Sequence, residues 1–314
     1  MKILVTGGCG YKGHRLIPKL LGEGYEVIAF DIQWFGNFLP PHPKLRVVQG
    51  DILKPDTIPL NGVDTIIHLA SIANDPCADL DPKLTWEVVT LATMQLANRA
   101  RKFGIRRFLY ASSGSVYGVK GEEKVTEELS LEPLSEYNKA KMVAERVLLS
   151  YQDEMEIYIV RPGTVCGYSP RMRFDVVVNM MVMQALSKGK MTVLGGGQIR
   201  PNIHIEDICD VYLHLLNYPE YVGIYNAAFE NLSIIEIAKL VQKYLPVEIE
   251  IKPSNDPRSY RMNSDKLLRT GFQPKKNVEE AIGEMISQFR GKADEDRYYN
   301  VKWMKQTVLT GSIQ

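Results

Sequence analysis

A glycine-rich turn near the start of the chain constrains its fold more than any other feature. Its sequence is Gly7-Gly8-Cys9-Gly10-Tyr11-Lys12-Gly13. The apolar run at residues 3–6 predicts a strand before the turn, and residues 16–21 carry apolar side chains at helical spacing after it. Glycines at such a strand-to-helix turn let the backbone bend sharply and approach a diphosphate, whose charge faces the helix N-terminus. The turn therefore predicts a dinucleotide-binding unit.

Short apolar runs alternate with helical patterns through the first 165 residues. Further strands are expected at Glu26–Asp31, Leu45–Gln49, 65–69, 108–111 and 157–160, with long helices at 83–103 and 135–150. Buried strands that alternate with helices are typical of a parallel sheet covered on both faces. The expected fold class is α/β, a Rossmann-type doubly wound parallel sheet with a smaller C-terminal α/β substrate-binding part.

The boundary between the two parts is placed where the regular alternation of strands and helices ends. Residues 1–165 are predicted to form the dinucleotide-binding domain, and residues 166–314 mainly the substrate-binding part. Residues 199–224 are expected to return to the first domain, so the two parts interleave. Helices are expected at 172–186, 206–216, 234–244 and 280–289, whereas the tail after Arg290 has no firm period.

Composition argues against several classes of function. The 38 Lys+Arg and 37 Asp+Glu residues give a net charge of +1, unlike a general nucleic-acid or membrane-surface binder. The apolar stretches fall well short of the roughly 20 residues that span a bilayer, and no secretory signal pattern is present, so a cytoplasmic protein is expected. The four cysteines form no C-x-x-C pair and the histidines have no metal spacing, so neither disulfides nor a metal site is expected.

Asp31 follows the glycine turn by 18 positions and ends the second expected strand. A carboxylate there can accept hydrogen bonds from both hydroxyls of an adenosine ribose, and it would repel a 2′-phosphate, so NAD is predicted rather than NADP. Asp51 and Ile52, after the third strand, are candidates for holding the adenine, or Asp51 is an ordinary turn residue. Lys12 either reaches the cofactor diphosphate or is an exposed helix lysine.

Two further segments carry groups for proton transfer. Ser112-Ser113-Gly114-Ser115-Val116-Tyr117-Gly118 follows the fifth strand, and Tyr137-Asn138-Lys139-Ala140-Lys141 opens the next helix. Tyr137 and Lys141 are four residues apart, so they lie on one helix face. An ammonium favours the phenolate form of a nearby tyrosine, which is otherwise a poor base because its pKa is about 10. With a serine hydroxyl on the same substrate oxygen, such a pair can remove a proton from an alcohol while hydride leaves its carbon.

Together these segments resemble the NAD-dependent epimerase/dehydratase family of extended short-chain dehydrogenases/reductases, and nucleotide-sugar 4-epimerases within it. The likeness extends to about residue 290 and includes His68-Leu69-Ala70, Arg161-Pro162 and Asn202-Ile203-His204-Ile205-Glu206-Asp207. It implies Ser113 as the active hydroxyl, Tyr137 as the base and Lys141 as its partner, with Ser115 as a second hydroxyl. The expected cofactor contacts are Gly7, Gly10, Tyr11, Lys12, Gly13, Asp31, Asp51, Ile52, Leu69, Ala70, Tyr137 and Lys141.

Family members usually act on nucleotide-diphosphate sugars, so the resemblance also implies a substrate site and an assembly. It places Asn179, Arg200 and Arg258 near the substrate diphosphate, with Arg261 as a competitor for the second arginine role, and Thr164 near the sugar. A homodimer is expected through a four-helix bundle of helices 83–103 and 135–150. Leu91 and Met142 are outward apolar candidates for that interface.

The chain departs from the family where some members carry acids. Sugar 4,6-dehydratases place an acidic pair directly after the active Ser or Thr, and decarboxylase relatives need Glu at the second of these positions. Here the two positions are Gly114 and Ser115. The leading hypothesis is therefore an NAD-dependent nucleotide-sugar epimerase that acts at C4 through a transient 4-keto sugar. The alternatives are a nucleotide-sugar dehydrogenase or ketoreductase, and a non-catalytic NAD-binding protein.

Overall fold

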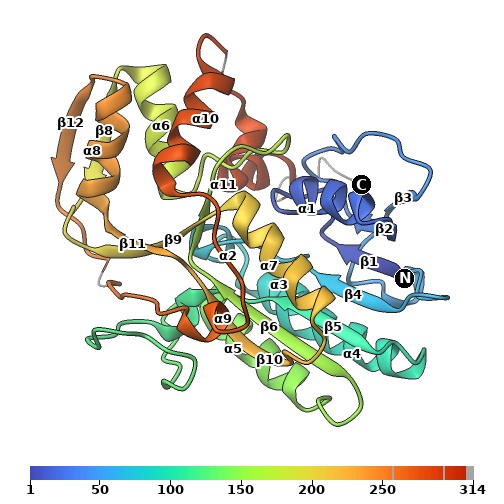
Figure 1. The fold of residues 1–314 in the computed structure, drawn as a ribbon. Helices are drawn as coiled ribbons and strands as arrows, with labels where there is room; N and C mark the ends of the chain where they lie inside the picture. The colour runs from blue at the N-terminus through green and yellow to red at the C-terminus, as the bar shows by residue number, and fades with distance from the viewer. Residues whose placement is uncertain (257, 293, 309–314) are drawn as a thin grey trace.

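The computed structural model describes residues 1–256, 258–292 and 294–308, except for the side chains of residues 307 and 308. Within them, the main sheet has seven parallel strands (Figure 1). Their order across the sheet is β10 (Gly223–Ala227), β6 (Glu156–Pro162), β5 (Arg107–Ala111), β4 (Thr65–His68), β1 (Lys2–Thr6), β2 (Glu26–Asp31) and β3 (Leu45–Gln49). The order changes direction between β1 and β4, as in a Rossmann-type doubly wound sheet, so the predicted fold class is confirmed.

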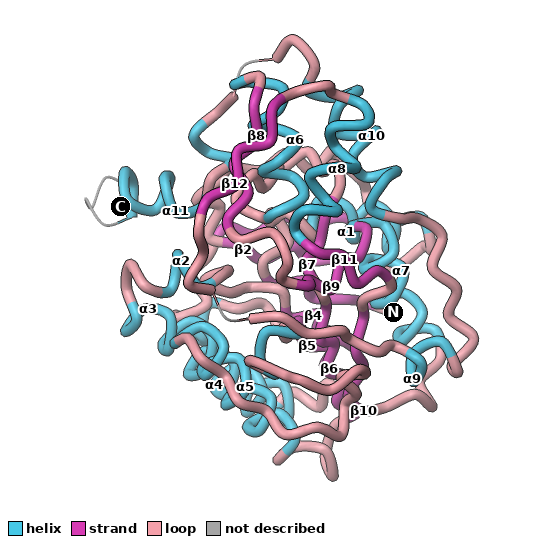
Figure 2. Tube along the Cα trace, turned by 90° about the vertical axis from the view of Figure 1, so that its left-hand side faces the viewer, coloured by secondary structure: helices cyan, strands magenta, loops and turns pink. Residues whose placement is uncertain are grey.

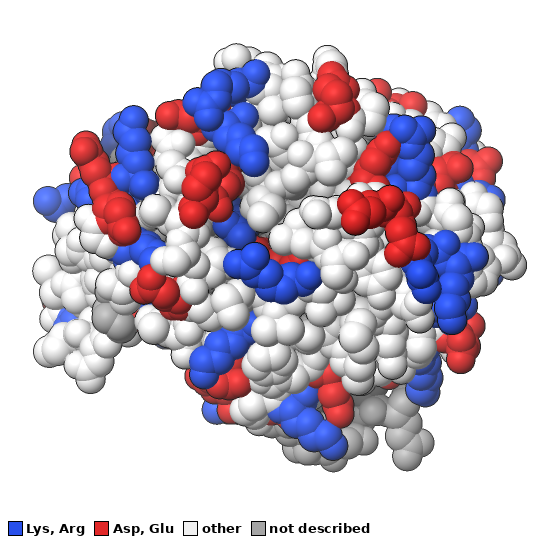
Figure 3. Space-filling model, turned by 90° about the horizontal axis from the view of Figure 1, so that it is seen from below, with Lys and Arg blue, Asp and Glu red and all other residues white. Residues whose placement is uncertain are grey.

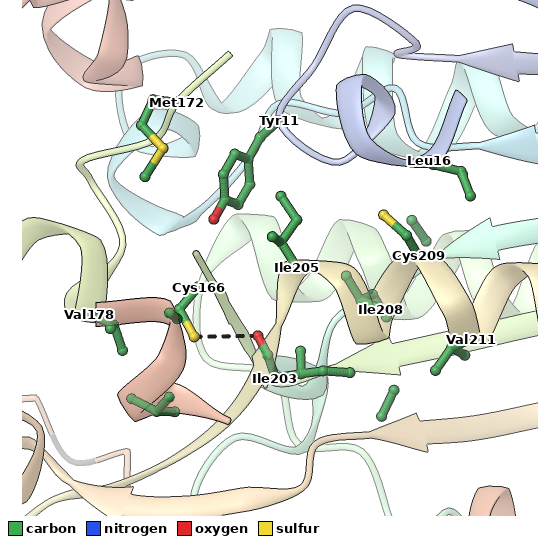
Figure 4. Packing of buried hydrophobic residues seen from close by; sticks show 14 of the residues in the cluster. Tyr11, Leu16, Cys166, Met172, Val178, Ile203, Ile205, Ile208, Cys209 and Val211 are labelled. Carbon is green, nitrogen blue, oxygen red and sulfur yellow. Dashed lines mark hydrogen bonds between the residues drawn. The ribbon is translucent and has the colours of Figure 1, made fainter. Parts of the chain in front are cut away.

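Helices cover both faces of this sheet because successive strand residues point to opposite sides. On β1, Ile3 and Val5 enter one core and Leu4 enters the other. In the first core, Leu16 and Cys209 lie close together between two helices (Figure 4). The first face is covered by α1 (Gly13–Gly22) and α7 (Ile205–Asn217), and the second by α4 (Ala92–Lys102) and α5 (Glu136–Leu149).

The chain beyond residue 165 builds a second lobe and then returns to the main sheet. The lobe holds the sheets β11-β9-β7 and β12-β8 (Figures 1 and 2). β10 pairs with β6 at the edge of the main sheet, so later residues do contribute to it. The division into two domains stays a prediction, and residues 309–314 lie outside the described residues. The lobe's strands are β7 (Thr164–Cys166), β8 (Lys190–Leu194), β9 (Ile199–His204), β11 (Glu230–Ser233) and β12 (Glu248–Lys252), and its main helices are α6 (Val177–Lys188), α8 (Ile234–Tyr244) and α10 (Val278–Phe289).

Two predicted helices differ from those observed. The stretch 83–103 is divided into α3 (Pro82–Trp86), a π-helical turn (Glu87–Leu91) and α4. The helix expected at 172–186 begins only at Val177. Arg173 and Asp175 form a two-pronged ion pair with distances of 2.9 and 3.0 Å, and side chains two positions apart in a helix do not face each other. This pair is therefore incompatible with the early helix start. The short helices α2 (Asp75–Ala78), α9 (Asp265–Leu268) and α11 (Asn300–Trp303) were not predicted.

The surface and the cysteines agree with the composition. Positive and negative side chains are interspersed over the face in Figure 3. All four cysteines are free and buried. No described helix combines the length and apolar character that a bilayer crossing needs.

A buried ion pair joins α5 to the main sheet. Arg161 on β6 donates from Nε and Nη2 to the Glu145 carboxylate of α5, at 2.6–3.2 Å. The two side chains are only 3% and 1% exposed, so neither charge is solvated by water. Arg161 also donates to the Tyr117 hydroxyl at 2.8 Å, and the Ser112 hydroxyl donates to Glu145. The pair thus fixes α5 against the ends of β5 and β6.

Glu145→Gln should strongly destabilise the protein because it leaves the Arg161 charge buried without its partner. We expect a loss of about 3–5 kcal/mol in the free energy of unfolding, measured by urea denaturation. The exposed pair of Arg101 and Glu154 is a control, and Glu154→Gln should cost under about 1 kcal/mol. The double change Glu145→Met with Arg161→Met should recover much of the loss. Equal losses of unfolding free energy in Glu145→Gln and Glu154→Gln would contradict this role of the buried pair.

Candidate active site

A cavity of about 540 Å³ opens at the carboxyl ends of the parallel strands. Its lining includes a residue at or just after each of five strands: Gly7 after β1, Asp31 at the end of β2, Leu69 after β4, Ser112 after β5 and Gly163 after β6. The cavity therefore lies where the strand order changes direction, which is the usual ligand site of an open α/β sheet.

The fold brings nearly all of the predicted site residues to this cavity. The lining contains Gly7, Gly10, Tyr11, Lys12, Gly13, Asp31, Asp51, Ile52, Leu69, Ala70, Ser113, Ser115, Tyr137, Lys141, Thr164, Arg200 and Arg258. Asn179 is the exception, because it is fully buried beside the glycine turn. Its amide accepts from the Gly167 nitrogen at 3.1 Å and donates to the Tyr11 hydroxyl at 3.1 Å. Its polar atoms are thus used inside the protein, and it is not among the residues that line the cavity.

The glycine turn is shaped to leave backbone open to a ligand. Gly7 has φ +68°, and a Cβ there would come within 2.6 Å of the Ala70 nitrogen, so only glycine fits. At Gly10 a Cβ would meet only the Gly7 carbonyl, at 3.1 Å, because this part of the turn faces the cavity. The Tyr11 hydroxyl donates to the Gly167 carbonyl at 2.6 Å and points toward the strand that carries Cys166 (Figure 4). The turn is therefore anchored on the second lobe.

Asp31 connects the glycine turn to the end of β2. Its carboxylate accepts from the Cys9 nitrogen at 3.0 Å and from the Gln33 nitrogen at 2.7 Å. Burial raises the pKa of Asp31, against the effect of these two donors. The carboxylate also lines the cavity, so oxygen lone pairs remain for a ribose diol. The turn and this acid together fit the adenosine and diphosphate of a dinucleotide.

Lys12 lines the cavity. This position favours the interpretation that it reaches the cofactor diphosphate over the interpretation that it is an exposed helix lysine. Its Nζ lies 6.0 Å from the centre of the Tyr212 ring. Burial lowers the pKa of Lys12 to about 8. A partly desolvated ammonium at this place is available to an anionic ligand.

The proton-transfer residues lie together in the lining of the cavity. The Ser113 and Ser115 hydroxyls are 2.7 Å apart, and the Ser113 hydroxyl is near enough to Tyr137 to lower its pKa. The Lys141 ammonium donates to the Ala111 carbonyl at 2.7 Å and lies 6.0 Å from the centre of the Tyr137 ring. The hydroxyls, the phenol and the ammonium therefore surround one part of the cavity.

Electrostatics at this cluster differ from the simple sequence expectation. Burial, then the Asp75 carboxylate, raises the pKa of Tyr137 to about 12. Among the cations, Arg173 opposes this rise most, rather than Lys141. Burial, followed by the nearby Lys12 charge, lowers the pKa of Lys141 to about 7. Arg173 therefore supplies a positive charge that the sequence motif alone does not include.

Elsewhere in the cavity lining, the two predicted substrate arginines share a carboxylate. Arg200 and Arg258 each donate to Asp256 at 2.8 Å, and Arg258 also contacts Asp75 at 2.5 Å. Burial alone would raise the pKa of Asp256. Hydrogen bonds from Arg258 outweigh this effect and lower the pKa to about 2. The arginines are thus already ordered around an anionic group, in the way that a diphosphate needs.

Several cavity residues were missed by sequence reasoning. They are Trp34, Phe35, Asn74, Asp75, Asp175, Tyr260 and Asn300. None of them belongs to one of the motifs, and Asn300 lies in the tail that showed no period. The short basic stretch of residues 169–173 is expected from the sequence to flank the sugar pocket, without assigned contacts, and the structure places Arg171 and Arg173 in the cavity lining.

Comparisons with known proteins agree with this geometry. The chain is 28% identical over 311 residues to UDP-glucuronic acid decarboxylase 1 of Arabidopsis thaliana, covering 93% of this chain and 70% of that protein. It is 24% identical over 313 residues to UDP-glucose 4-epimerase of Lactobacillus helveticus, covering 90% and 95%. The structure of UDP-glucose 4-epimerase of Thermus thermophilus in complex with NAD is similar, with a TM-score of 0.83 at 25% identity, covering 93% and 100%.

The family model described as "NAD dependent epimerase/dehydratase family" matches residues 3–228, which include the glycine turn, Asp31, the serines and the Tyr137–Lys141 pair. The match spans well over half of the chain, and the cavity holds the residues that an NAD site needs. The chain therefore belongs to the NAD-dependent epimerase/dehydratase family.

Proposed function

We propose that the chain is a nucleotide-sugar epimerase that inverts C4 through a transient 4-keto sugar. The observation that carries this proposal is the cluster of Ser113, Tyr137 and Lys141, next to Gly114 and Ser115 instead of an acidic pair. Inversion at C4 needs proton transfer to and from one hydroxyl and no separate acid to expel water. The similarity to a UDP-glucose 4-epimerase supports the proposal.

In this mechanism the side chains handle the proton and the sugar oxygen. Tyr137 accepts the proton of the C4 hydroxyl, and Ser113 donates a hydrogen bond to the same oxygen. Lys141 and Arg173 stabilise the phenolate by their positive charge. Bound NAD supplies a reversible two-electron acceptor. After the keto sugar has rotated in the cavity, Tyr137 returns the proton to the oxygen at C4.

The carboxylates near the sugar are unsuited to acid catalysis because each is engaged by arginine. Asp75 pairs with Arg258, and Asp175 pairs with Arg173. Arg200 and Arg258 are proposed to hold the substrate diphosphate, which would compete with Asp256 for them. Thr164 and Ser115 also line the cavity and are proposed sugar contacts. Asn179 has no proposed ligand role.

Two other outcomes use the same residues. A dehydrogenase or ketoreductase would release the oxidised sugar or reduce one. Decarboxylation of a nucleotide-linked uronic acid is favoured by the 28% identity to a UDP-glucuronic acid decarboxylase, although Ser115 stands where an acid is needed. Purified protein should be incubated with UDP-, dTDP- and GDP-linked hexoses and uronic acids, with NADH absorbance and sugar NMR as readouts. A C4 epimer without net NADH supports the proposal, whereas net NADH or a released CO₂ would replace it by one of the alternatives.

Tyr137→Phe should reduce turnover by about 10²–10⁴-fold because it removes the proton acceptor. NADH affinity, measured by fluorescence titration, should change little because the aromatic ring remains. Tyr151→Phe is a matched control on the surface side of the second core and should keep full activity. Near-normal turnover by Tyr137→Phe would refute the assignment of the base.

Lys12→Met should move the alkaline limb of the pH profile. Lys12 lowers the pKa of Lys141, so its removal should raise that pKa above its value of about 7. Since Lys141 assists only while protonated, the fall of kcat/KM with rising pH should shift to higher pH. Lys139→Met removes a half-exposed lysine of α5, the helix of Lys141, that pairs with Glu136, and it should leave the profile unchanged. A profile unmoved by Lys12→Met would contradict this coupling.

A homodimer is proposed through the helices beside the second core. Leu91 and Met94 are each 41% exposed there, which is unusual for large apolar side chains on neighbouring turns. Met142, the other sequence candidate, is half-buried against a smaller cluster. Leu91→Asp with Met94→Asp should give a monomer in analytical ultracentrifugation. Ile251→Asp, at a 61% exposed position on β12, is the control and should not change the mass. A monomeric wild type, or a dimer that survives the double change, would refute this interface.

A further inference from the structure

The C-terminal segment, defined here as residues 294–306, docks beside the cofactor end of the cavity. Met304 is only 2% exposed and packs in the core that contains Ile52, and α11 packs against α2 (Figure 2). The Tyr298 carbonyl accepts from the Phe174 nitrogen at 2.8 Å. The segment is therefore part of the folded body.

The same segment contacts the loop that follows Asp31. The Trp303 indole donates to the Trp34 carbonyl at 2.7 Å, and its ring lies 6.4 Å from that of Phe35. Trp34 and Phe35 line the cavity within four residues of Asp31, and Asn300 lines it from the segment. One wall of the adenosine end is thus made by a loop and by the segment that holds it.

Arg171 lies between these two elements without a direct ion-pair partner among the described residues, although the Asp175 and Asp31 carboxylates are near enough to oppose the lowering of its pKa. It is 3% exposed, and its guanidinium carbon lies 4.0 Å from the centre of the Phe35 ring. It donates to the carbonyl of Met172 and to the amide oxygen of Asn300, both neutral, while its Nε has no partner among the described residues. Burial, then the neighbouring Arg173, lowers the pKa of Arg171 to about 9. A buried cation of this kind is stabilised by a bound anion.

We propose that Arg171, oriented by Asn300, holds the diphosphate of NAD, so that the docked C-terminal segment keeps the cofactor bound from one turnover to the next. The glycine turn leaves backbone donors on one side of that diphosphate, and Arg171 supplies a charge from the other lobe. Release of the cofactor then requires the loss of the contact between Arg171 and the diphosphate. This proposal concerns the cofactor alone, so it stands whichever sugar reaction the enzyme performs.

The test is the binding and release of NADH, followed by energy transfer from Trp34 and Trp303. Arg171→Met removes the charge and should speed NADH release by roughly tenfold or more. Asn300→Asp is the sharper variant, because it keeps the shape but gives Arg171 an internal carboxylate that competes with the diphosphate. It should weaken NADH binding to a similar extent without lowering the thermal stability of the free protein. Lys302→Met, an exposed change in the same segment, should release NADH at the wild-type rate.

A double variant separates this role from a merely structural one. If Asn300 acts through Arg171, the protein with both Arg171→Met and the neutral change Asn300→Ala should release NADH no faster than with Arg171→Met alone. A purely structural contact predicts instead that Asn300→Asp tightens the docking and leaves NADH release unchanged. Wild-type release by Asn300→Asp, or effects of the two changes that multiply, would overturn the proposal.

Discussion

The buried ion pair of Glu145 and Arg161 is the interaction on which the geometry of the site depends. Tyr137, Lys141 and Glu145 follow one another at intervals of four on α5, so they share one face of that helix. The pair sets the rotation of α5 against β6, and this rotation directs Tyr137 and Lys141 toward the ends of the strands. Through Ser112 the same carboxylate contacts the segment that carries Ser113. The stability of the fold and the alignment of the proton-transfer groups thus have a common origin.

A second feature is the concentration of positive charge in a protein that is nearly neutral as a whole. Lys12, Lys141, Arg171 and Arg173 all line one cavity, although the net charge of the chain is only +1. Burial lowers the pKa of Lys12 to about 8, of Lys141 to about 7 and of Arg171 to about 9. The same lining includes Asp31, Asp51, Asp75 and Asp175, so part of this charge is balanced within the protein. The diphosphates of a dinucleotide and of a nucleotide sugar would further stabilise the buried cations. Balanced charge outside the site is consistent with ligands that are small.

The fold and the cofactor side of the site could be predicted because they depend on local rules. Gly7 needs a positive φ, Asp31 ends a strand, and Tyr137 and Lys141 are one helical turn apart. The missing parts depend on tertiary placement instead. Arg173 and Asp175 interrupt a pattern that otherwise reads as helix, and Asn300 is brought to Arg171 from 129 positions away along the chain. Asn179 matched a family position, but its hydrogen bonds with Tyr11 and Gly167 draw it into the core.

These features favour an enzyme that keeps its cofactor bound and returns to the sugar the hydride and the proton that were removed from it. The most direct test is turnover of the accepted nucleotide sugar deuterated at C4, in ordinary water and without added NAD, with the product analysed by NMR and mass spectrometry. The proposed mechanism predicts a C4 epimer that retains its deuterium at C4, because a nicotinamide cofactor that stays bound would accept the deuteride reversibly and shield it from the solvent. Deuterium lost to the solvent, or an unaltered configuration at C4, would contradict it.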